Sequence, residues 1–218
     1  MPELTPEIIA RWLTGYVVLL FSLSVHESAH GWMAHRMGDD TAYSQGRVSL
    51  NPLVHIDPIG TVLMPLIQLF ASGIPLLAWA KPTPVGAQNF RNLARGHVLV
   101  AGAGPASNLA LAATFTSLLF VAVRAGLAAQ GTPVRNILWY GIVMNVVLFL
   151  FNLVPLPPLD GSWIASWGLP RSWASQYDRI VEPYGQWILL LLVMSGGIGW
   201  ILGPVLNVLA VVVARFVL

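Results

Sequence analysis

Long apolar segments alternate with shorter polar ones along the whole chain. Near-continuous runs of hydrophobic residues cover about positions 8–34, 58–79, 96–124, 136–154 and 184–217. Each run is long enough for a helix that crosses about 30 Å of hydrocarbon, which takes roughly 20 residues. The polar segments between them, 35–57, 80–95, 125–135 and 155–183, are rich in Pro and Gly and are expected to be loops. The pattern predicts an all-α polytopic membrane protein.

The last apolar run, 184–217, is too long for one upright helix. Gly196, Gly197 and Gly199 lie near its middle and allow the chain to turn there. We expect either two short helices or one span followed by a helix in the membrane interface. Together the five runs predict about five to six transmembrane helices.

The composition agrees with this assignment and excludes several classes of function. Only 9% of the 218 residues are charged and 56% are hydrophobic, whereas about 25% of an ordinary soluble domain is charged. The absence of Cys excludes disulfides, iron–sulfur clusters and a cysteine nucleophile. The net charge of +2 comes without a basic run, so no nucleic-acid partner is expected. We expect one membrane-embedded domain over 1–218, with a core at about 8–165, C-terminal helices at 184–217 and the lipid bilayer as its surroundings.

Three ionisable residues stand near the end of the first apolar run, namely His26, Glu27 and His30. On a helix, positions four apart share a face, so both imidazoles can point at one metal ion. This is the HExxH arrangement, in which two histidines bind zinc and the glutamate acts as a general base on a bound water. The alternative, polar residues that extend toward the membrane surface, is disfavoured because the cluster lies below that surface.

A catalytic zinc takes three protein ligands and a water, so the pattern requires a third ligand. The candidates are His35, His55, Asp57, His97 and Asp160. Asp160 is the most informative, because Pro155, Pro157 and Pro158 end the preceding helix while the sequence stays apolar. Non-helical backbone at membrane depth is tolerated only where protein buries it or water reaches it. The alternative is that Asp160 only forms a turn with Gly161.

The pair of motifs, 26–30 and 152–161, resembles the site-2 protease family of intramembrane zinc metalloproteases. The resemblance also includes Asn51–Pro58 and the small-residue stretch Ala103–Asn108, and it spans roughly residues 10–165. It implies His26, His30 and Asp160 as Zn²⁺ ligands and Glu27 as the general base. It further implies hydrolysis of a peptide bond in or near the transmembrane segment of a membrane-protein substrate.

A helical substrate has to be unwound before its carbonyls can be attacked. Alternating apolar and polar residues between Arg47 and Leu50 suggest a short β-strand region near 42–50 that could hold an extended substrate, and an ordinary polar hairpin is the alternative. Asn152 is a candidate for stabilising the oxyanion or positioning substrate, or else it bridges helices. His55 is a further candidate, for which a structural hydrogen bond is the favoured role, whereas Gly102, Gly104 and Ser107 suit close helix packing.

Zinc chemistry also constrains the topology. His30 lies toward the C-terminal end of the first apolar run and Asp160 follows the C-terminal end of 136–154, so both ends must open on one side of the membrane. One run between them should therefore not cross, and we expect 58–79, broken by Pro65, Gly73 and Pro75, to be re-entrant. The catalytic side then collects more basic residues than the opposite side. They are Arg36, Arg47, Lys81, Arg91, Arg95, Arg171 and Arg179, against Arg11, Arg124 and Arg135. The positive-inside rule predicts a multi-pass protein of the cell membrane with a cytoplasmic active site.

Two other functions use similar residues. A membrane metal-ion transporter also places His and Glu in helices, but it should carry facing ligands on several spans, whereas here they concentrate in one HExxH and one Asp. An inactive metal-binding scaffold need not keep Glu27. The sequence indicates neither the substrate's identity nor the oligomeric state.

Overall fold

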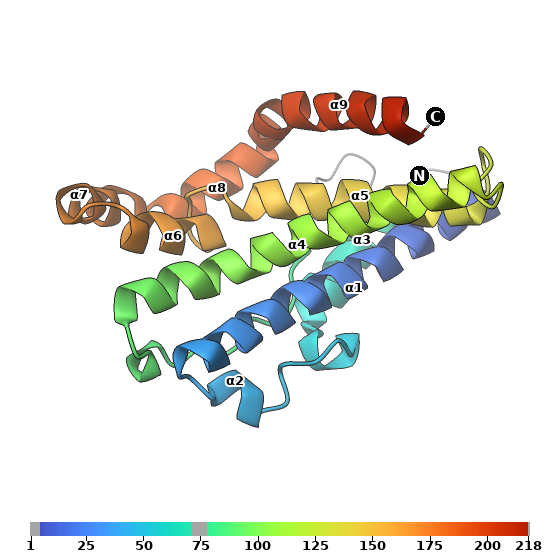
Figure 1. Ribbon diagram of the computed structural model, residues 1–218. Coiled ribbons are helices and arrows are strands. Elements are labelled where there is room, and N and C mark those ends of the chain that lie inside the picture. Colours follow the sequence, from blue (N-terminus) through green and yellow to red (C-terminus); the bar gives the residue numbers. More distant parts are fainter. Residues whose placement is uncertain (1–4, 71–77, 218) are drawn as a thin grey trace.

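Three long helices form the frame of the molecule, α1 (Pro6–Met37), α4 (Leu93–Arg124) and α5 (Pro133–Asn152). The structure, a computed structural model, describes residues 5–70 and 78–217. Each of the three helices is long and apolar enough to cross a membrane. They lie side by side, and α4 contacts both α1 and α5 (Figure 1).

Local sequence explains where α1 begins and ends. The side chain of Thr5 accepts a hydrogen bond from the Ile8 amide, and Pro6 occupies the first helical position. The helix stops at Gly38, whose φ of 107° is a left-handed conformation that favours glycine. Between these two ends α1 is one continuous helix, and it places His26 and His30 of the HExxH motif in the interior of the bundle.

The side of α4 that packs against its neighbours is built from small residues. Gly96, Ala101, Ala103, Gly104 and Ala112 are all buried. Small side chains allow helices in a membrane to approach closely and to gain dispersion contacts without a hydrophobic driving force. The expectation that 102–107 is a close-packing stretch holds for Gly104, whereas nothing lies within 4 Å of a Cβ built at Gly102.

The C-terminal part of the chain is folded back by two breaks. Helices α6 (Asp160–Gly168) and α7 (Arg171–Val181) follow the Pro-rich turn after α5, and then α8 (Gly185–Met194) and α9 (Gly197–Val217) meet at 70°. Gly196, with a φ of 74°, sits at that second break. This confirms the predicted turn among the glycines near position 196.

The prediction of five to six transmembrane helices is wrong for the described residues. Three helices qualify as candidate spans, or up to four if the bent pair α8 and α9 is counted as one. The hydrophobic runs are present, but the bend divides 184–217, and the described part of 58–79 holds only a π-helical turn and a seven-residue helix. Hydrophobicity alone therefore overestimates the number of crossings.

The predicted re-entrant segment begins with a π-helical turn (Pro58–Leu63) and α3 (Met64–Phe70), which together are shorter than a span. Residues 71–77, where the chain would turn back, lie outside the described residues. The two ends of the segment meet: the Trp79 amide donates to the Gly60 carbonyl at 3.4 Å, and the Thr61 hydroxyl donates to the Trp79 carbonyl at 3.1 Å. A re-entrant path requires ends that meet in this way.

The predicted β-strand region near 42–50 is wrong, since no strand occurs in residues 5–70 or 78–217. The segment forms a one-turn helix, α2 (Thr41–Ser44), followed by irregular chain. The Ser49 amide donates to the Ser28 hydroxyl of α1 at 3.1 Å, and the same hydroxyl donates to the Ser49 carbonyl. A side chain of α1 thus satisfies backbone groups that a strand would have paired with another strand.

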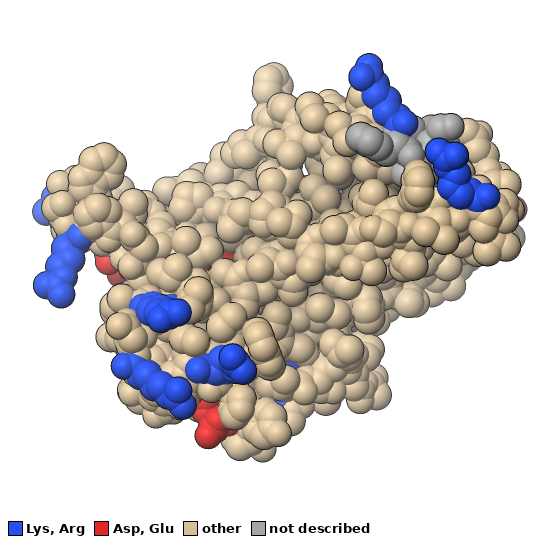
Figure 2. Space-filling view, in the orientation of Figure 1, with Lys and Arg blue, Asp and Glu red and all other residues tan. Residues whose placement is uncertain are grey.

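Arg47 joins two loops on this side of the bundle. Its buried guanidinium donates to the carbonyls of Val54 at 2.5 Å, Lys81 at 2.6 Å and Pro82 at 3.2 Å. The loop before the 58–79 segment includes a 3₁₀ turn (Pro52–His55), and another such turn (Ala87–Asn89) follows the loop after it. Basic side chains elsewhere gather toward the two ends of the long helices, and the apolar middle is nearly free of them (Figure 2).

Candidate metal centre

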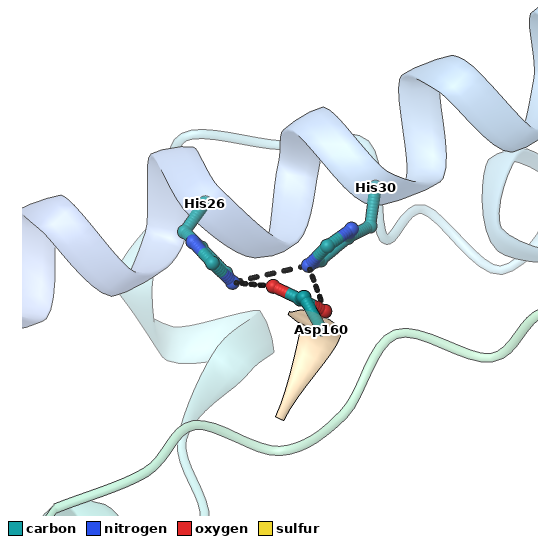
Figure 3. Close-up of side chains that lie close together, drawn as sticks. All are labelled: His26, His30 and Asp160. Atoms are coloured by element: carbon teal, nitrogen blue, oxygen red, sulfur yellow. Dashed lines mark hydrogen bonds and ion pairs between the residues drawn. The ribbon is translucent and has the colours of Figure 1, made fainter. Parts of the chain in front are cut away.

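His26 and His30 project from one face of α1 toward the interior (Figure 3). Both are buried, with 5% and 8% of their surface exposed. Their Nε2 atoms are 3.0 Å apart, and the rings meet edge to face with centroids separated by 4.6 Å. The i, i+4 spacing on an unbroken helix is sufficient to place them so, because four residues make slightly more than one turn.

Asp160, the first residue of α6, reaches the same point from the other side. Its Oδ2 lies 3.2 Å from His26 Nε2, and its Oδ1 lies 3.4 Å from His30 Nε2. Gly161 allows this approach, because a Cβ there would collide with the backbone of Leu153 and Val154. The structure therefore brings together all three residues for which the sequence predicted a shared ion, and their ligand atoms lie within 4.8 Å of one another.

The hydrogen bonds around this group leave its centre without a donor. The Val100 carbonyl, which can only accept, lies 2.7 Å from Nδ1 of His30, so the proton of the neutral ring sits on Nδ1 and Nε2 presents a lone pair. Asp160 Oδ2 is buried and accepts no hydrogen bond from the described residues, so its contact with His26 Nε2 is one of proximity alone. Lone pairs that converge at these distances repel each other unless protons or a cation lie between them.

The donor set and the available space fit a metal ion. Two imidazoles and one carboxylate are the ligand types of catalytic zinc, which keeps a fourth position for water. On the α4 side the ligands face Gly104, where a Cβ would come within contact distance of both His26 and His30. A glycine at this position keeps the space around the two Nε2 atoms open.

Glu27 is held next to this group by the loop that follows the 58–79 segment. The backbone amide of Thr83 donates to Glu27 Oε2 at 2.8 Å, and the Thr83 hydroxyl donates to the Glu27 carbonyl at 3.0 Å. One carboxylate oxygen is thereby fixed. No hydrogen bond is formed by Oε1 in the part of the chain that the structure describes.

A cavity of about 910 Å³ opens onto these residues. Glu27, the three candidate ligands and Asn152 all line it, and most of its remaining wall is apolar. At its wall, His97 lies between Trp163 and Trp167 of α6, with ring centroids 5.2 Å and 4.3 Å away and nearly parallel planes. The cavity is large enough for several residues of an extended peptide.

The other predicted residues are placed differently. Asn152 lines the cavity, and its amide donates to the Leu148 carbonyl one turn earlier at 3.0 Å. His55 is buried beside Ser49, whose carbonyl lies 2.8 Å from its Nε2, and is not a member of the His–His–Asp group. Burial lowers the pKa of His55 more than its hydrogen bond to Ser49 raises it, so it packs as a neutral ring. His35 contacts Asp40 at the end of α1.

The sequence interpretation missed several residues near the site. Thr83 carries no motif, because its role depends on a backbone amide that any non-proline residue would supply. Asn145 lies in the middle of an apolar run and is completely buried. A polar amide within such a run indicates a buried hydrogen-bond partner and could have been recognised from the sequence. His97, a candidate third ligand in the sequence, is not a member of the His–His–Asp group but lines the cavity.

Comparison with known proteins connects this arrangement to proteases. The chain is 40% identical over 194 residues to "Putative zinc metalloprotease YwhC" of Bacillus subtilis, covering 88% of this chain and 84% of that protein. It is 30% identical over 191 residues to "Putative zinc metalloprotease Rip2" of Mycolicibacterium smegmatis, covering 86% and 65%. It is 35% identical over 158 residues to "Putative zinc metalloprotease Rip3" of Mycobacterium tuberculosis, covering 70% and 31%. No family model and no solved structure matches the chain.

Proposed function

The chain belongs to the zinc metalloprotease family of YwhC and Rip2, and from this premise we propose that it is an intramembrane protease of the site-2 type. Zn²⁺ is its expected cofactor, and its apolar helices are those of a membrane protein. The proposed reaction is hydrolysis of a peptide bond in or near the transmembrane segment of a membrane-protein substrate. The observation that carries this proposal is the His26–His30–Asp160 group, two buried histidines and a partly buried aspartate that share one cavity with Glu27.

His26, His30 and Asp160 would hold the zinc through Nε2, Nε2 and a carboxylate oxygen. Bound zinc lowers the pKa of a coordinated water toward about 7 and polarises a carbonyl. Glu27 takes the proton of the attacking water on Oε1, while the Thr83 amide keeps Oε2 in place. Glu27 then returns this proton to the nitrogen of the leaving amine, as a general acid.

The cavity supplies the environment that peptide hydrolysis within a membrane requires. Its volume and apolar lining suit the side chains of a transmembrane segment, and it has room for water beside Glu27 and the candidate ligands. Asn152 lines the cavity and is the proposed substrate-positioning or oxyanion-binding side chain, for which its amide has to exchange its bond to Leu148. His55, by contrast, is proposed to act through the loop that it supports.

The distribution of basic residues supports a proposed orientation of the site. With the 58–79 segment re-entrant, seven basic residues share the side of the membrane on which α1 ends and three share the opposite side. If the bent pair α8 and α9 crosses once, Arg215 in the last turn of α9 joins the opposite side, and the balance is seven against four. The positive-inside rule therefore supports an active site that opens toward the cytoplasm.

One experiment separates catalysis from metal binding. Purified protein is incubated with candidate single-span substrates, with and without a zinc chelator, alongside the variants Glu27→Gln and His30→Ala. We expect Glu27→Gln to retain zinc and to lose cleavage by a factor of about 10² to 10⁴, because only the proton acceptor is removed. His30→Ala should lose both zinc and cleavage.

Equal cleavage by Glu27→Gln and the unmodified protein would refute this mechanism. A transporter would instead move metal across vesicle membranes without cutting any peptide. Among the described residues one His/Asp cluster has metal-ligand geometry, and transport would need further ligands along a path.

A further inference from the structure

A chain of buried amide groups leads away from one of the candidate ligands. Nδ1 of His26 lies 2.6 Å from Oδ1 of Asn108 on α4, and Nδ2 of Asn108 donates to Oδ1 of Asn145 on α5 at 3.0 Å. Nδ2 of Asn145 donates in turn to the Ser22 hydroxyl at 2.9 Å and to the Gly141 carbonyl at 2.8 Å. Ser22, Asn108 and Asn145 are each 0% exposed. The chain thus connects all three long helices.

The far end of this chain has a fixed polarity. The Gly141 carbonyl belongs to the backbone and can only accept a hydrogen bond, so the side-chain group of Asn145 that faces it must be the NH₂. The Oδ1 of Asn145 must then face Asn108, which obliges Asn108 to point its own NH₂ toward Asn145. The opposite orientation would place two buried oxygens 2.8 Å apart with no proton between them.

The same polarity reaches His26. Once the NH₂ of Asn108 is engaged, its Oδ1 faces His26 and can only accept, so the proton of the neutral imidazole has to sit on Nδ1. Nε2 is then left with a free lone pair directed at Asp160 and His30. The Val100 carbonyl selects the same tautomer of His30 directly, because it accepts a hydrogen bond from Nδ1 of that ring.

We propose that Asn145, with Asn108, is a positioning residue that selects the metal-binding tautomer of His26. The Gly141 carbonyl fixes the orientation of the Asn145 amide, which in turn fixes the orientation of the Asn108 amide that faces His26. This inference rests on the proposed zinc site and adds to it two residues that hold no metal. Partners behind a metal-bound histidine commonly set its tautomer and ring orientation, and their loss weakens metal binding by about 10- to 100-fold. Asn145 acts here through Asn108 and not through contact with the ligand.

The test uses zinc affinity, measured by competition with a chelator, on purified full-length protein in detergent. Asn145→Leu removes the partner that orients Asn108, and we expect zinc affinity to fall about tenfold or more. The double variant Asn108→Asp/Asn145→Leu should restore affinity to within about threefold of the unmodified protein. Both oxygens of an aspartate are acceptors, so this side chain needs no orienting partner to face the Nδ1 proton of His26.

Ser24→Ala is the matched control, because Ser24 is buried on α1 near His26 and, within residues 5–70 and 78–217, its hydroxyl bonds only to the Leu20 carbonyl of its own helix. Its zinc affinity should be unchanged. Wild-type affinity in folded Asn145→Leu would overturn the proposal. Loss without rescue by Asn108→Asp would also overturn it, because that result assigns Asn145 to helix packing alone.

A second measurement does not depend on whether any variant folds. In zinc-loaded unmodified protein with ¹⁵N-labelled histidine, the spectrum should show His26 protonated on Nδ1 and metal-bound through Nε2. Coordination through Nδ1 would overturn the proposal. If the unmodified protein binds no zinc, the proposed function itself fails. If it binds zinc and Asn145→Leu binds equally well, only this inference fails.

Discussion

At the scale of single residues, the space around the ligands is controlled by a glycine. A Cβ at Gly104 would lie against the imidazoles of His26 and His30, whereas a Cβ at Gly102 would meet nothing within 4 Å. The two glycines are two positions apart on α4, so they form a matched pair for substitution.

We expect Gly104→Ala to reduce zinc affinity by about tenfold to a hundredfold. Forcing one extra carbon into a packed site costs about 1–3 kcal/mol, and each 1.4 kcal/mol is a tenfold change in affinity. Gly102→Ala should bind zinc as the unmodified protein does. Chelator competition measures both, and equal affinities for the two variants would contradict the close approach of α4.

Asp39 illustrates a second residue-scale effect, at the end of α1. It is 0% exposed, and its carboxylate accepts hydrogen bonds from Thr41 N and Oγ1 at 3.2 and 2.5 Å, Gly86 N at 2.7 Å and Asn89 Nδ2 at 2.8 Å. Burial raises its pKa, but these hydrogen bonds outweigh burial and hold the pKa below the ordinary value of 3.8. The ionised form is therefore the one that the fold stabilises.

We expect Asp39→Ala to destabilise the protein by about 1–3 kcal/mol at neutral pH, because buried donors lose their acceptor. A carboxyl with a lowered folded-state pKa contributes stability above its unfolded-state pKa, and this contribution is lost as the pH falls through the folded-state value. The difference from the unmodified protein should therefore narrow below about pH 4. Thermal unfolding in detergent measures this, with Asp40→Ala, whose side chain is 73% exposed, as the control.

At the scale of elements, the placement of Asp160 depends on how α6 lies against α4. His97 of α4 is stacked between two tryptophans of α6, and Asp160 is the first residue of the same short helix. This aromatic stack holds α6 at two positions, about one and two turns after the candidate ligand. Stacked aromatic pairs contribute about 0.5–1.5 kcal/mol beyond the area that they bury.

His97→Ala should therefore weaken zinc binding by about twofold to tenfold, because α6 is held less firmly. His97→Phe keeps an aromatic ring in the stack and should retain most of the affinity. Zinc competition on the two variants distinguishes stacking from any chemistry of the imidazole. An equal loss in both would show that the ring nitrogens of His97 matter.

At the scale of the whole molecule, the paths of the polar loops determine where the active site opens. The chain contains no Cys, so single cysteines can be introduced and labelled from either side of the membrane without a background signal. With a re-entrant 58–79 segment, cysteines within 36–57 and within 80–95 should be labelled from the same side. A cysteine within 125–132 should be labelled from the opposite side.

Labelling of 36–57 and 80–95 from opposite sides would contradict the re-entrant path and, with it, the cytoplasmic orientation. The contacts between Gly60, Thr61 and Trp79 favour the same-side result, because they place the two ends of the segment together.

Periodicity and composition determined the local features of this protein. The spacing of His26 and His30 places both rings on one face of any uninterrupted helix, and the apolar runs require a lipid environment whatever the helices do next. The glycines near position 196 likewise predicted a bend, because a left-handed turn depends on the residue at that position and its immediate neighbours.

Only the tertiary structure decided which distant residues meet. The meeting of Asp160 with α1, the hydrogen bond from Thr83 to Glu27 and the amide chain through Asn145 all depend on the packing of separate helices and loops. The false strand near 42–50 had the same origin, because its backbone found a partner in Ser28 of α1. A sequence pattern records which face of an element is apolar, but partners far apart in sequence are selected by shape and hydrogen bonding once the elements pack together.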